Sequence, residues 1–104
     1  SAKIVNVGAR GGMTGNPFMS AYSASKSAVI RLTESMAQEH KRFGINVNCV
    51  VPSIIDTPRN RADMPDAEFS SWVTPEALSV VIVFLASRAA EQIDGAANPV
   101  DGLA

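Results

Sequence analysis

The sequence contains one cysteine and one histidine in 104 residues, which narrows the chemistry that it can support. A single cysteine, Cys49, cannot build a disulfide framework, and its place in an apolar run predicts a buried side chain. His40 precedes Lys41 and Arg42 near the expected end of a helix, where cations are favourable, so we interpret it as structural. Without further histidine, cysteine or clustered carboxylates, the sequence predicts no metal site.

The sequence has no excess of positive charge and no long apolar run. Nine Lys and Arg residues stand against ten Asp and Glu residues, so no basic surface is expected for nucleic acid or an anionic membrane. The longest apolar run, VVIVFLA at residues 80–86, falls far short of the roughly 20 residues that span a bilayer. The opening SAKIVNV lacks the pattern of a secretory signal. We therefore expect a cytoplasmic protein with no nucleic-acid or membrane partner.

What the chain does contain is the composition of one small globular domain, with 46% hydrophobic and 18% charged residues. Hydrophobic patterning predicts strands at residues 3–9, 45–51 and 96–100, and helices at residues 20–43 and 75–87. The order strand, helix, strand, helix, strand, with helices of crossover length, predicts an α/β fold with a parallel sheet.

Several local signals place the ends of these elements. Gly44 is suited to end the first helix, and the strand at residues 45–51 is apolar on both faces at its end, which predicts a central position. Thr74, Pro75 and Glu76 form a helix start, because Thr caps, Pro suits the first position and Glu favours the positive end of the dipole. The second helix is nearly all apolar, so we expect most of its circumference to be buried.

Two further regions carry weaker signals. Every fourth residue from 24 to 36 is apolar, and this stripe could face the core or a second subunit. Residues 52–73 contain three of the six prolines, and we expect them to be irregular apart from one helical turn near residues 66–72.

The stretch VNVGARGGMTGN, residues 5–16, holds four glycines directly after a predicted strand. Their spacing fits neither the G-x-G-x-x-G dinucleotide fingerprint nor the G-x-x-x-x-G-K-[ST] phosphate loop. No acidic residue follows a second strand at the distance that a ribose contact requires. Taken alone, this loop is best interpreted as a flexible turn.

Downstream of this loop, YSASK places Tyr22 and Lys26 four residues apart on the predicted helix, so both side chains share one face. A phenol is a weak acid at neutral pH, and a neighbouring ammonium group favours its ionised form. Such a tyrosine can transfer a proton. By itself this spacing is weak evidence for a catalytic pair, because any helix can show it by chance.

Taken together, KIVNVGA, YSASK, GINVNCVVPSIIDTP, VIVFLAS and PVDG resemble, in this order, the C-terminal half of the short-chain dehydrogenase/reductase family. The resemblance covers nearly all of residues 1–104. It implies half of a Rossmann-type doubly wound sheet, an NAD(P)H cofactor with NADH favoured, and hydride transfer. It also implies that the N-terminal cofactor-binding half of the family's domain lies outside this sequence.

The resemblance assigns functions to individual residues. Tyr22 would be the proton donor or acceptor, and Lys26 would assist it and bind the nicotinamide ribose. Gly8, Pro52, Ile55 and Thr57 match positions beside the cofactor, although Ser53 stands where the family usually has glycine.

One departure concerns catalysis directly. The family's catalytic serine lies thirteen residues before the tyrosine, and this sequence has Ala9 there. Loss of one donor to a developing alkoxide costs roughly 10²–10³-fold in rate, so ordinary ketone reduction should be slow.

The segment DTPRNRADMPDAEFSSW, residues 56–72, is similar to a loop of dihydropteridine reductase-like members of the family, which also lack that serine. This similarity implies a quinonoid dihydropterin as substrate, whose reduction builds no charge on a single carbonyl oxygen. Phe69 and Trp72 would either line a pterin pocket or anchor the loop, because aromatic rings serve both purposes. Asn60 and Arg61 would either bind a ligand or carry exposed polar groups. Asp56 could organise a turn.

Two alternatives remain open at this point. The chain could be a catalytically silent assembly module, since it lacks a nucleotide fingerprint, or a general carbonyl or alcohol dehydrogenase. The family resemblance also implies a homodimer or homotetramer formed through the helices at residues 20–43 and 74–87. A small molecule, either pterin-like or carbonyl, is the expected substrate.

Overall fold

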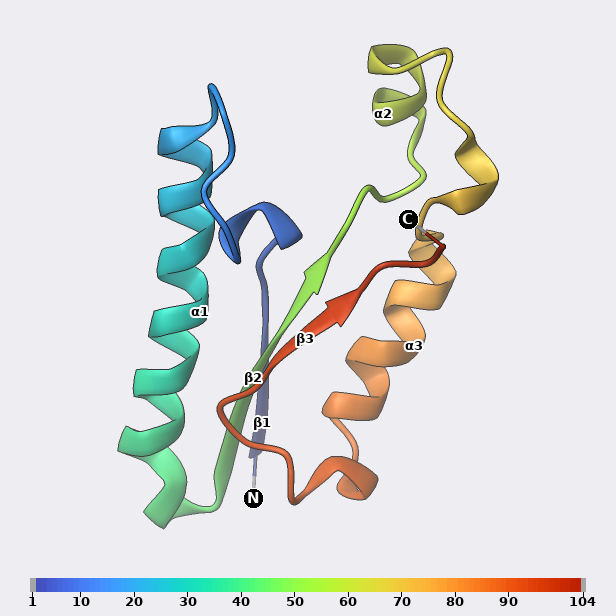
Figure 1. The fold of residues 1–104 in the computed structure, drawn as a ribbon. Coiled ribbons are helices and arrows are strands. Elements are labelled where there is room, and N and C mark those ends of the chain that lie inside the picture. Colours follow the sequence, from blue (N-terminus) through green and yellow to red (C-terminus); the bar gives the residue numbers. More distant parts are fainter. Residues whose placement is uncertain (1, 104) are drawn as a thin grey trace.

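The computed structural model describes residues 2–103 and contains one parallel sheet flanked by helices (Figure 1). Its strands are β1 (Ala2–Val7), β2 (Ile45–Pro52) and β3 (Ala97–Val100). The α-helices are α1 (Ser20–His40), α2 (Pro58–Asp63) and α3 (Pro75–Leu85). Four 3₁₀ turns complete the described part: η1 (Arg10–Gly12), η2 (Lys41–Phe43), η3 (Phe69–Ser71) and η4 (Arg88–Ala90). The predicted α/β order is confirmed.

Strand β2 lies between β1 and β3, as its apolar character on both faces predicted. On one face, Ile30 of α1 packs on Cys49 and Val51. On the other face, Leu78 and Leu85 of α3 belong to a second cluster with Val50. The two helices therefore cover opposite faces of the sheet (Figure 1).

Cys49 is fully buried, as predicted, in the middle of this central strand. Burial raises the pKa of the Cys49 thiol, because a low-dielectric site disfavours the thiolate. The residue is therefore an unreactive core side chain.

Helix α1 begins at the predicted residue and continues as η2 up to Phe43. Gly44 then takes a left-handed conformation with φ of 72°, which glycine adopts without steric cost. The stripe of every fourth residue from 24 to 36 is not the buried face. Ile30, Thr33 and Ala37 face the sheet, whereas Leu32 is 54% exposed.

Helix α3 starts as predicted, with Oγ1 of Thr74 accepting a hydrogen bond of 3.1 Å from the Ala77 amide. The expectation that most of its circumference is buried is wrong. Val80 and Val83 are 69% and 67% exposed, because only the side of the helix that carries Leu78 and Leu85 meets the sheet.

Helix α2 lies within the segment that was expected to be irregular, and it was not predicted from the sequence. Thr57 caps this helix by accepting a 3.1 Å hydrogen bond from the Asn60 amide, and Pro58 occupies its first position. This is the same Thr-Pro signal that identified α3. The expected turn near residues 66–72 is present as η3.

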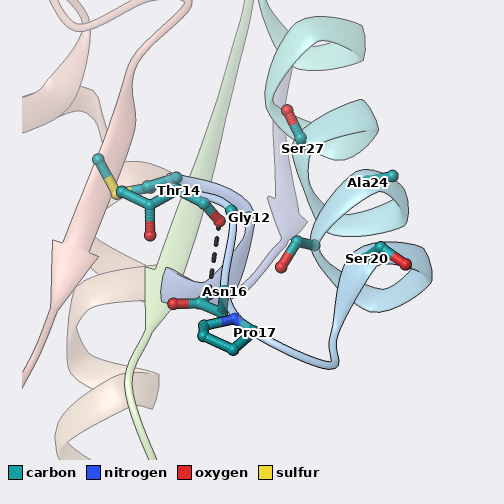
Figure 2. A pocket seen from close by; sticks show the side chains of 10 residues that line it. Gly12, Thr14, Asn16, Pro17, Ser20, Ala24 and Ser27 are labelled. Atoms are coloured by element: carbon teal, nitrogen blue, oxygen red, sulfur yellow. Dashed lines mark hydrogen bonds between the residues drawn. The ribbon is translucent and has the colours of Figure 1, made fainter.

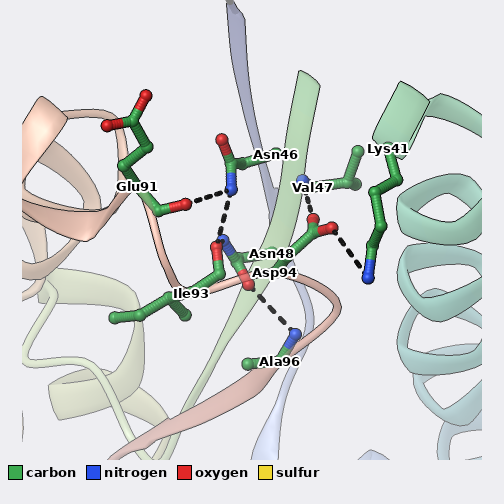
Figure 3. Close-up of polar contacts among 8 residues, drawn as sticks. All are labelled: Lys41, Asn46, Val47, Asn48, Glu91, Ile93, Asp94 and Ala96. Atoms are coloured by element: carbon green, nitrogen blue, oxygen red, sulfur yellow. Dashed lines mark hydrogen bonds and ion pairs between the residues drawn. The ribbon is translucent and has the colours of Figure 1, made fainter. Parts of the chain in front are cut away.

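A network of side-chain amides fixes the segment that leads into β3 (Figure 3). The buried Asn48 donates a 2.8 Å hydrogen bond to the Ile93 carbonyl and accepts one of 3.0 Å from the Ala96 amide. Asp94 accepts from the Val47 amide at 2.9 Å. These bonds lie near the start of β2, at the end of the strand opposite to Pro52. They fix the position of the segment that enters β3 at that end of the sheet.

Within residues 2–103, no helix has both the length and the apolar character that crossing a membrane requires.

Candidate functional site

A cavity of about 680 Å³ lies where the chain leaves the carboxyl ends of β1 and β2. Ligands bind at this edge in open parallel sheets, because the loops that follow the strands meet there. The cavity is lined by Val7, Gly8, Ala9, Arg10, Gly11, Asn16, Met19, Tyr22, Lys26, Pro52, Ser53, Ile54, Ile55, Asn60 and Met64.

Tyr22 and Lys26 line this cavity together from the first turns of α1. The Lys26 Nζ atom lies 5.9 Å from the centre of the Tyr22 ring, which brings the ammonium group and the phenol together as the spacing predicted. Tyr22 is 43% exposed and lines the cavity, so a bound molecule can contact it.

Two loop glycines allow the glycine-rich segment to lie directly against these residues. A Cβ atom on Gly11 would lie 2.9 Å from Cε1 of Tyr22. A Cβ atom on Gly12 would lie 2.5 Å from the carbonyl carbon of Lys26, closer than real Cβ atoms approach. Gly15, in contrast, has open space around it. The loop is therefore a close-packed wall of the site, and not the flexible turn that its glycines suggest when they are considered alone.

Ala9 lies in this wall, is almost fully buried and offers no hydroxyl group. The nearby serines of α1 do not replace it. Ser20 and Ser23 line a separate hollow of about 670 Å³ between the loop and the other side of α1 (Figure 2). The Ser25 hydroxyl donates to the Tyr22 carbonyl within the helix.

The loop after β2 contributes to the cavity through Asn60, whose side-chain amide donates a 2.8 Å hydrogen bond to the Ile55 carbonyl. Arg61 does not line the cavity. Its guanidinium donates to both carboxylate oxygens of Asp56, at 2.7 and 2.9 Å. The hydrogen bond from Arg61 lowers the pKa of the Asp56 carboxyl group, because it stabilises the ionised form.

The aromatic residues of this loop serve as anchors. Trp72 is 6% exposed and its ring centre lies 4.9 Å from that of Phe69. The Arg61 guanidinium lies 4.5 Å from the centre of the Phe69 ring. Neither aromatic residue is among those that line the Tyr22 cavity. Of the two interpretations left open by the sequence, anchoring of the loop is the one that this geometry fits.

Residues 1–68 match the model of a known protein family, described as "short chain dehydrogenase". This chain belongs to the short chain dehydrogenase family. The finding confirms the family resemblance drawn from YSASK and its neighbouring motifs.

Individual relatives agree with this membership. The chain is 35% identical over 113 residues to cyclohexanol dehydrogenase of Rhodococcus sp. (strain TK6), covering 98% of this chain and 42% of the relative. It is 39% identical over 110 residues to galactitol 2-dehydrogenase of Rhizobium johnstonii (strain DSM 114642 / LMG 32736 / 3841), covering 94% of this chain and 43% of the relative. The chain thus spans less than half the length of these relatives. Neither relative is named as a dihydropteridine reductase.

Solved structures of the family superpose closely on the described fold. A 4-hydroxyisoleucine dehydrogenase complexed with NADH matches 96% of this chain and 45% of its own, with a TM-score of 0.86 and 31% identity. A putative 2-deoxy-D-gluconate 3-dehydrogenase from Agrobacterium tumefaciens with bound NADP matches 98% of this chain and 46% of its own, with a TM-score of 0.88 and 33% identity. The Rossmann-type fold predicted from the sequence is therefore confirmed.

The positions that the short chain dehydrogenase family assigns to the cofactor fall in two places. Gly8, Pro52 and Ile55 line the cavity with Tyr22 and Lys26. Thr57 caps α2 with its hydroxyl group and lines a neighbouring hollow of about 440 Å³ instead. The structure thus gathers five of the six predicted site residues in one cavity, and their functions in binding remain predictions.

Arg10, Met19 and Met64 also line the cavity, although they were not predicted from the sequence as site residues. Arg10 follows Ala9 directly, so its position next to the missing serine could have identified it. Within residues 2–103, no cluster of three or more His, Cys, Asp or Glu side chains is placed to hold a metal ion.

Proposed function

We propose that this chain forms the catalytic part of an NAD(P)H-dependent oxidoreductase of the short chain dehydrogenase family. The observation that carries the proposal is the pair of Tyr22 and Lys26 in one cavity at the carboxyl edge of the sheet. Family membership supports the same conclusion.

The side chains of this cavity fit a nicotinamide riboside. The Lys26 ammonium and the Tyr22 hydroxyl supply donors suited to ribose oxygens, and Pro52 and Ile55 supply apolar surface suited to a flat ring. When bound, the cofactor supplies the hydride. The related structures carry NADH or NADP, and we propose NADH as the preferred form, which parallel titrations with both cofactors will test.

In this proposal, Tyr22 donates a proton to the substrate atom that gains electron density. Lys26, one helical turn away, stabilises the phenolate that remains and holds the ribose. The absence of side chains at Gly11 and Gly12 lets the loop wall lie directly against Tyr22 and the backbone of Lys26.

For the substrate, we propose a quinonoid dihydropterin or a similar conjugated imine. Ala9 leaves no hydroxyl at the position where the family stabilises an alkoxide, and none of Ser20, Ser23 or Ser25 lines the cavity. A conjugated ring spreads the transferred electron pair over several atoms, so its reduction depends less on that donor. The likeness of residues 56–72 to the dihydropteridine reductase loop supports the same substrate class.

The test measures NADH oxidation by the native protein that contains this sequence, with a quinonoid dihydropterin as acceptor. We expect Tyr22→Phe to lower kcat by about 10²–10⁴-fold, the usual contribution of a positioned acid, while NADH still binds. Dihydropterin reduction that proceeds at an unchanged rate in Tyr22→Phe would refute the proton transfer.

A general carbonyl or alcohol dehydrogenase is the second candidate, and the names of the relatives favour it. The variant Ala9→Ser distinguishes the two candidate functions. If the site is built for a conjugated imine, the added hydroxyl raises ketone reduction and leaves dihydropterin reduction within about twofold. A native protein that already reduces cyclohexanone faster than the dihydropterin would favour the second candidate.

We further propose that the exposed apolar residues of the helices contact a second copy of the protein. Leu32 on α1 and Val80, Val83 and Phe84 on α3 are all exposed, and such patches mark interaction surfaces. In the silent-module alternative this assembly would be the chain's only activity. Tight NADH binding by the native protein would exclude that alternative.

A further inference from the structure

We propose that Arg10 selects substrates with two adjacent hydrogen-bond acceptors, such as a carboxylate or a ring carbonyl beside a ring nitrogen, and that Asp101 positions it. The inference rests on the proposed function to the extent that it treats the Tyr22 cavity as the substrate site.

Arg10 and Asp101 approach each other from the two edge strands of the sheet. Arg10 follows the end of β1, directly after Ala9, and Asp101 follows the end of β3. Between them, the Ser53 hydroxyl donates a 3.1 Å hydrogen bond to the Asp101 carbonyl, and the Ser53 amide donates to the Val100 carbonyl at 3.0 Å. The end of β2 therefore holds the backbone that carries the Asp101 side chain.

Contacts engage two of the three nitrogens of the guanidinium group. Its Nε atom lies 3.0 Å from Oδ1 of Asp101, and its Nη1 atom lies 3.0 Å from the Met13 sulfur. Oδ1 of Asp101 is buried and makes no aligned hydrogen bond, so this contact is an ion pair that orients the arginine by charge. The Arg10 side chain remains 44% exposed, and its Nη2 atom donates to none of the described residues.

This arrangement leaves donors free at the cavity. A guanidinium presents its N–H groups in a planar fork that matches two adjacent acceptor atoms. In Arg10 the outer nitrogen Nη1 faces only the weak thioether acceptor of Met13, and Nη2 donates to no described residue, so a ligand can bind both. A lysine at this position would provide a point charge without the fork.

The charge of the cavity points to the same class of ligand. Its lining contains two cationic side chains, Arg10 and Lys26, and no acidic one. Lys26 is adjacent to Tyr22 and is assigned to the cofactor ribose, so Arg10 is the cation left for the substrate. Since Ala9 provides no hydroxyl group, Arg10 is also the charged donor nearest in sequence to the position of the family's serine.

The experiment compares the native protein with Arg10→Met, Arg10→Lys and Asp101→Asn, with Arg59→Met as the matched control. Arg59 pairs with Asp63 on α2, is 86% exposed and does not line the cavity. The probes are a quinonoid dihydropterin, acetoacetate, which is a ketone with a carboxylate, and cyclohexanone, which has a single neutral carbonyl. NADH oxidation gives kcat and KM for each probe.

We expect Arg10→Met to raise KM about 10- to 100-fold for whichever acceptor-bearing probe the native protein reduces. KM for cyclohexanone and the Kd for NADH should stay within about twofold. Compared with Arg10→Met, Arg10→Lys should restore a low KM for acetoacetate more fully than for the dihydropterin, because a point charge can bind a carboxylate but does not match the two acceptors of a ring edge. Asp101→Asn should raise KM in the same direction by a smaller factor, and Arg59→Met should change nothing.

If Arg10→Met raised KM equally for all three probes, or left all three KM values unchanged, the assignment would be overturned. Reduction of acetoacetate without reduction of the dihydropterin would refute the proposed pterin substrate and still test Arg10. Calorimetric titration of acetoacetate and an oxidised pterin into the NAD-loaded protein provides a readout without turnover. If the native protein binds neither probe more tightly than cyclohexanone, Arg10 has no selecting function.

Discussion

Gly12 shows at the scale of a single residue how the loop wall is built. Its Cα faces the backbone of Lys26 at a distance that leaves no room for a side chain. Glycine is therefore required here for close approach. Its backbone conformation is not the reason, since its φ is not among the positive values found at Gly44, Gly95 and Gly102.

We predict that Gly12→Ala destabilises the fold by about 1–3 kcal/mol, the usual cost of overpacking, and lowers activity by displacing the loop from Tyr22. Gly15→Ala is the matched control, because open space surrounds that position. Urea denaturation and NADH oxidation measure the two effects. Equal stability of the two variants would contradict the packing argument.

The ion pair between Asp56 and Arg61 makes a residue-scale contribution that depends on pH. Since the pKa of the folded Asp56 carboxyl is lowered, its stabilisation is present above the unfolded value of about 4 and disappears as the pH falls through the folded value. We predict that Asp56→Asn reduces the acid sensitivity of the unfolding free energy below about pH 4. The measurement is urea denaturation from pH 7 to pH 3. A parallel loss of stability in both proteins across this range would argue against the contribution.

At the scale of elements, local capping signals fix where α2 and α3 begin. Thr57 and Thr74 each precede a proline and each cap a helix through their hydroxyl oxygen. The first cap holds α2, which carries Asn60 into the cavity, and the second holds α3, which covers the opposite face from α1.

We predict that Thr74→Ala lowers the unfolding free energy by about 0.5–2 kcal/mol, because the Ala77 amide loses its partner, whereas Thr74→Ser retains the cap. NADH oxidation should be unchanged in both variants, since Thr74 lies outside the Tyr22 cavity. Thermal unfolding compares the two. A serine variant as unstable as the alanine variant would show that the threonine methyl group, and not the cap, is responsible.

At the scale of the whole molecule, the chain leaves apolar surface open. The sheet order places β1 and β3 at its edges within the described residues, and the outer side of α3 carries exposed valines. The relatives are more than twice as long as the matched region, so their folds have further segments that could cover part of such surface.

We predict that Val83→Asp weakens self-association of the native protein by at least about tenfold in Kd, because a carboxylate replaces an apolar side chain at the proposed contact. Sedimentation velocity over a range of concentrations measures the effect. Glu76→Gln on the same helix serves as a control for a change of charge. If the native protein is monomeric at all concentrations, α3 does not bind a second copy.

Local features of this chain could be predicted from its sequence. The helix start at Ser20, the stop at Gly44 and the cap at Thr74 depend on interactions within a few residues, and all three are present. The juxtaposition of Tyr22 and Lys26 follows from helix geometry alone. The parallel order of the strands follows from helices of crossover length between them.

The tertiary structure decided what depends on distant packing. It placed Trp72 in the core rather than in the cavity, turned Leu32 and Val83 outward, and assigned the Thr57 hydroxyl to a helix cap. It also brought Arg10 to Asp101 across 91 positions of the chain. The sequence determined which elements form, because their hydrogen bonds and caps are local. Which side chains share a cavity was decided by the faces that the sheet buries, and those depend on contacts between residues far apart in the chain.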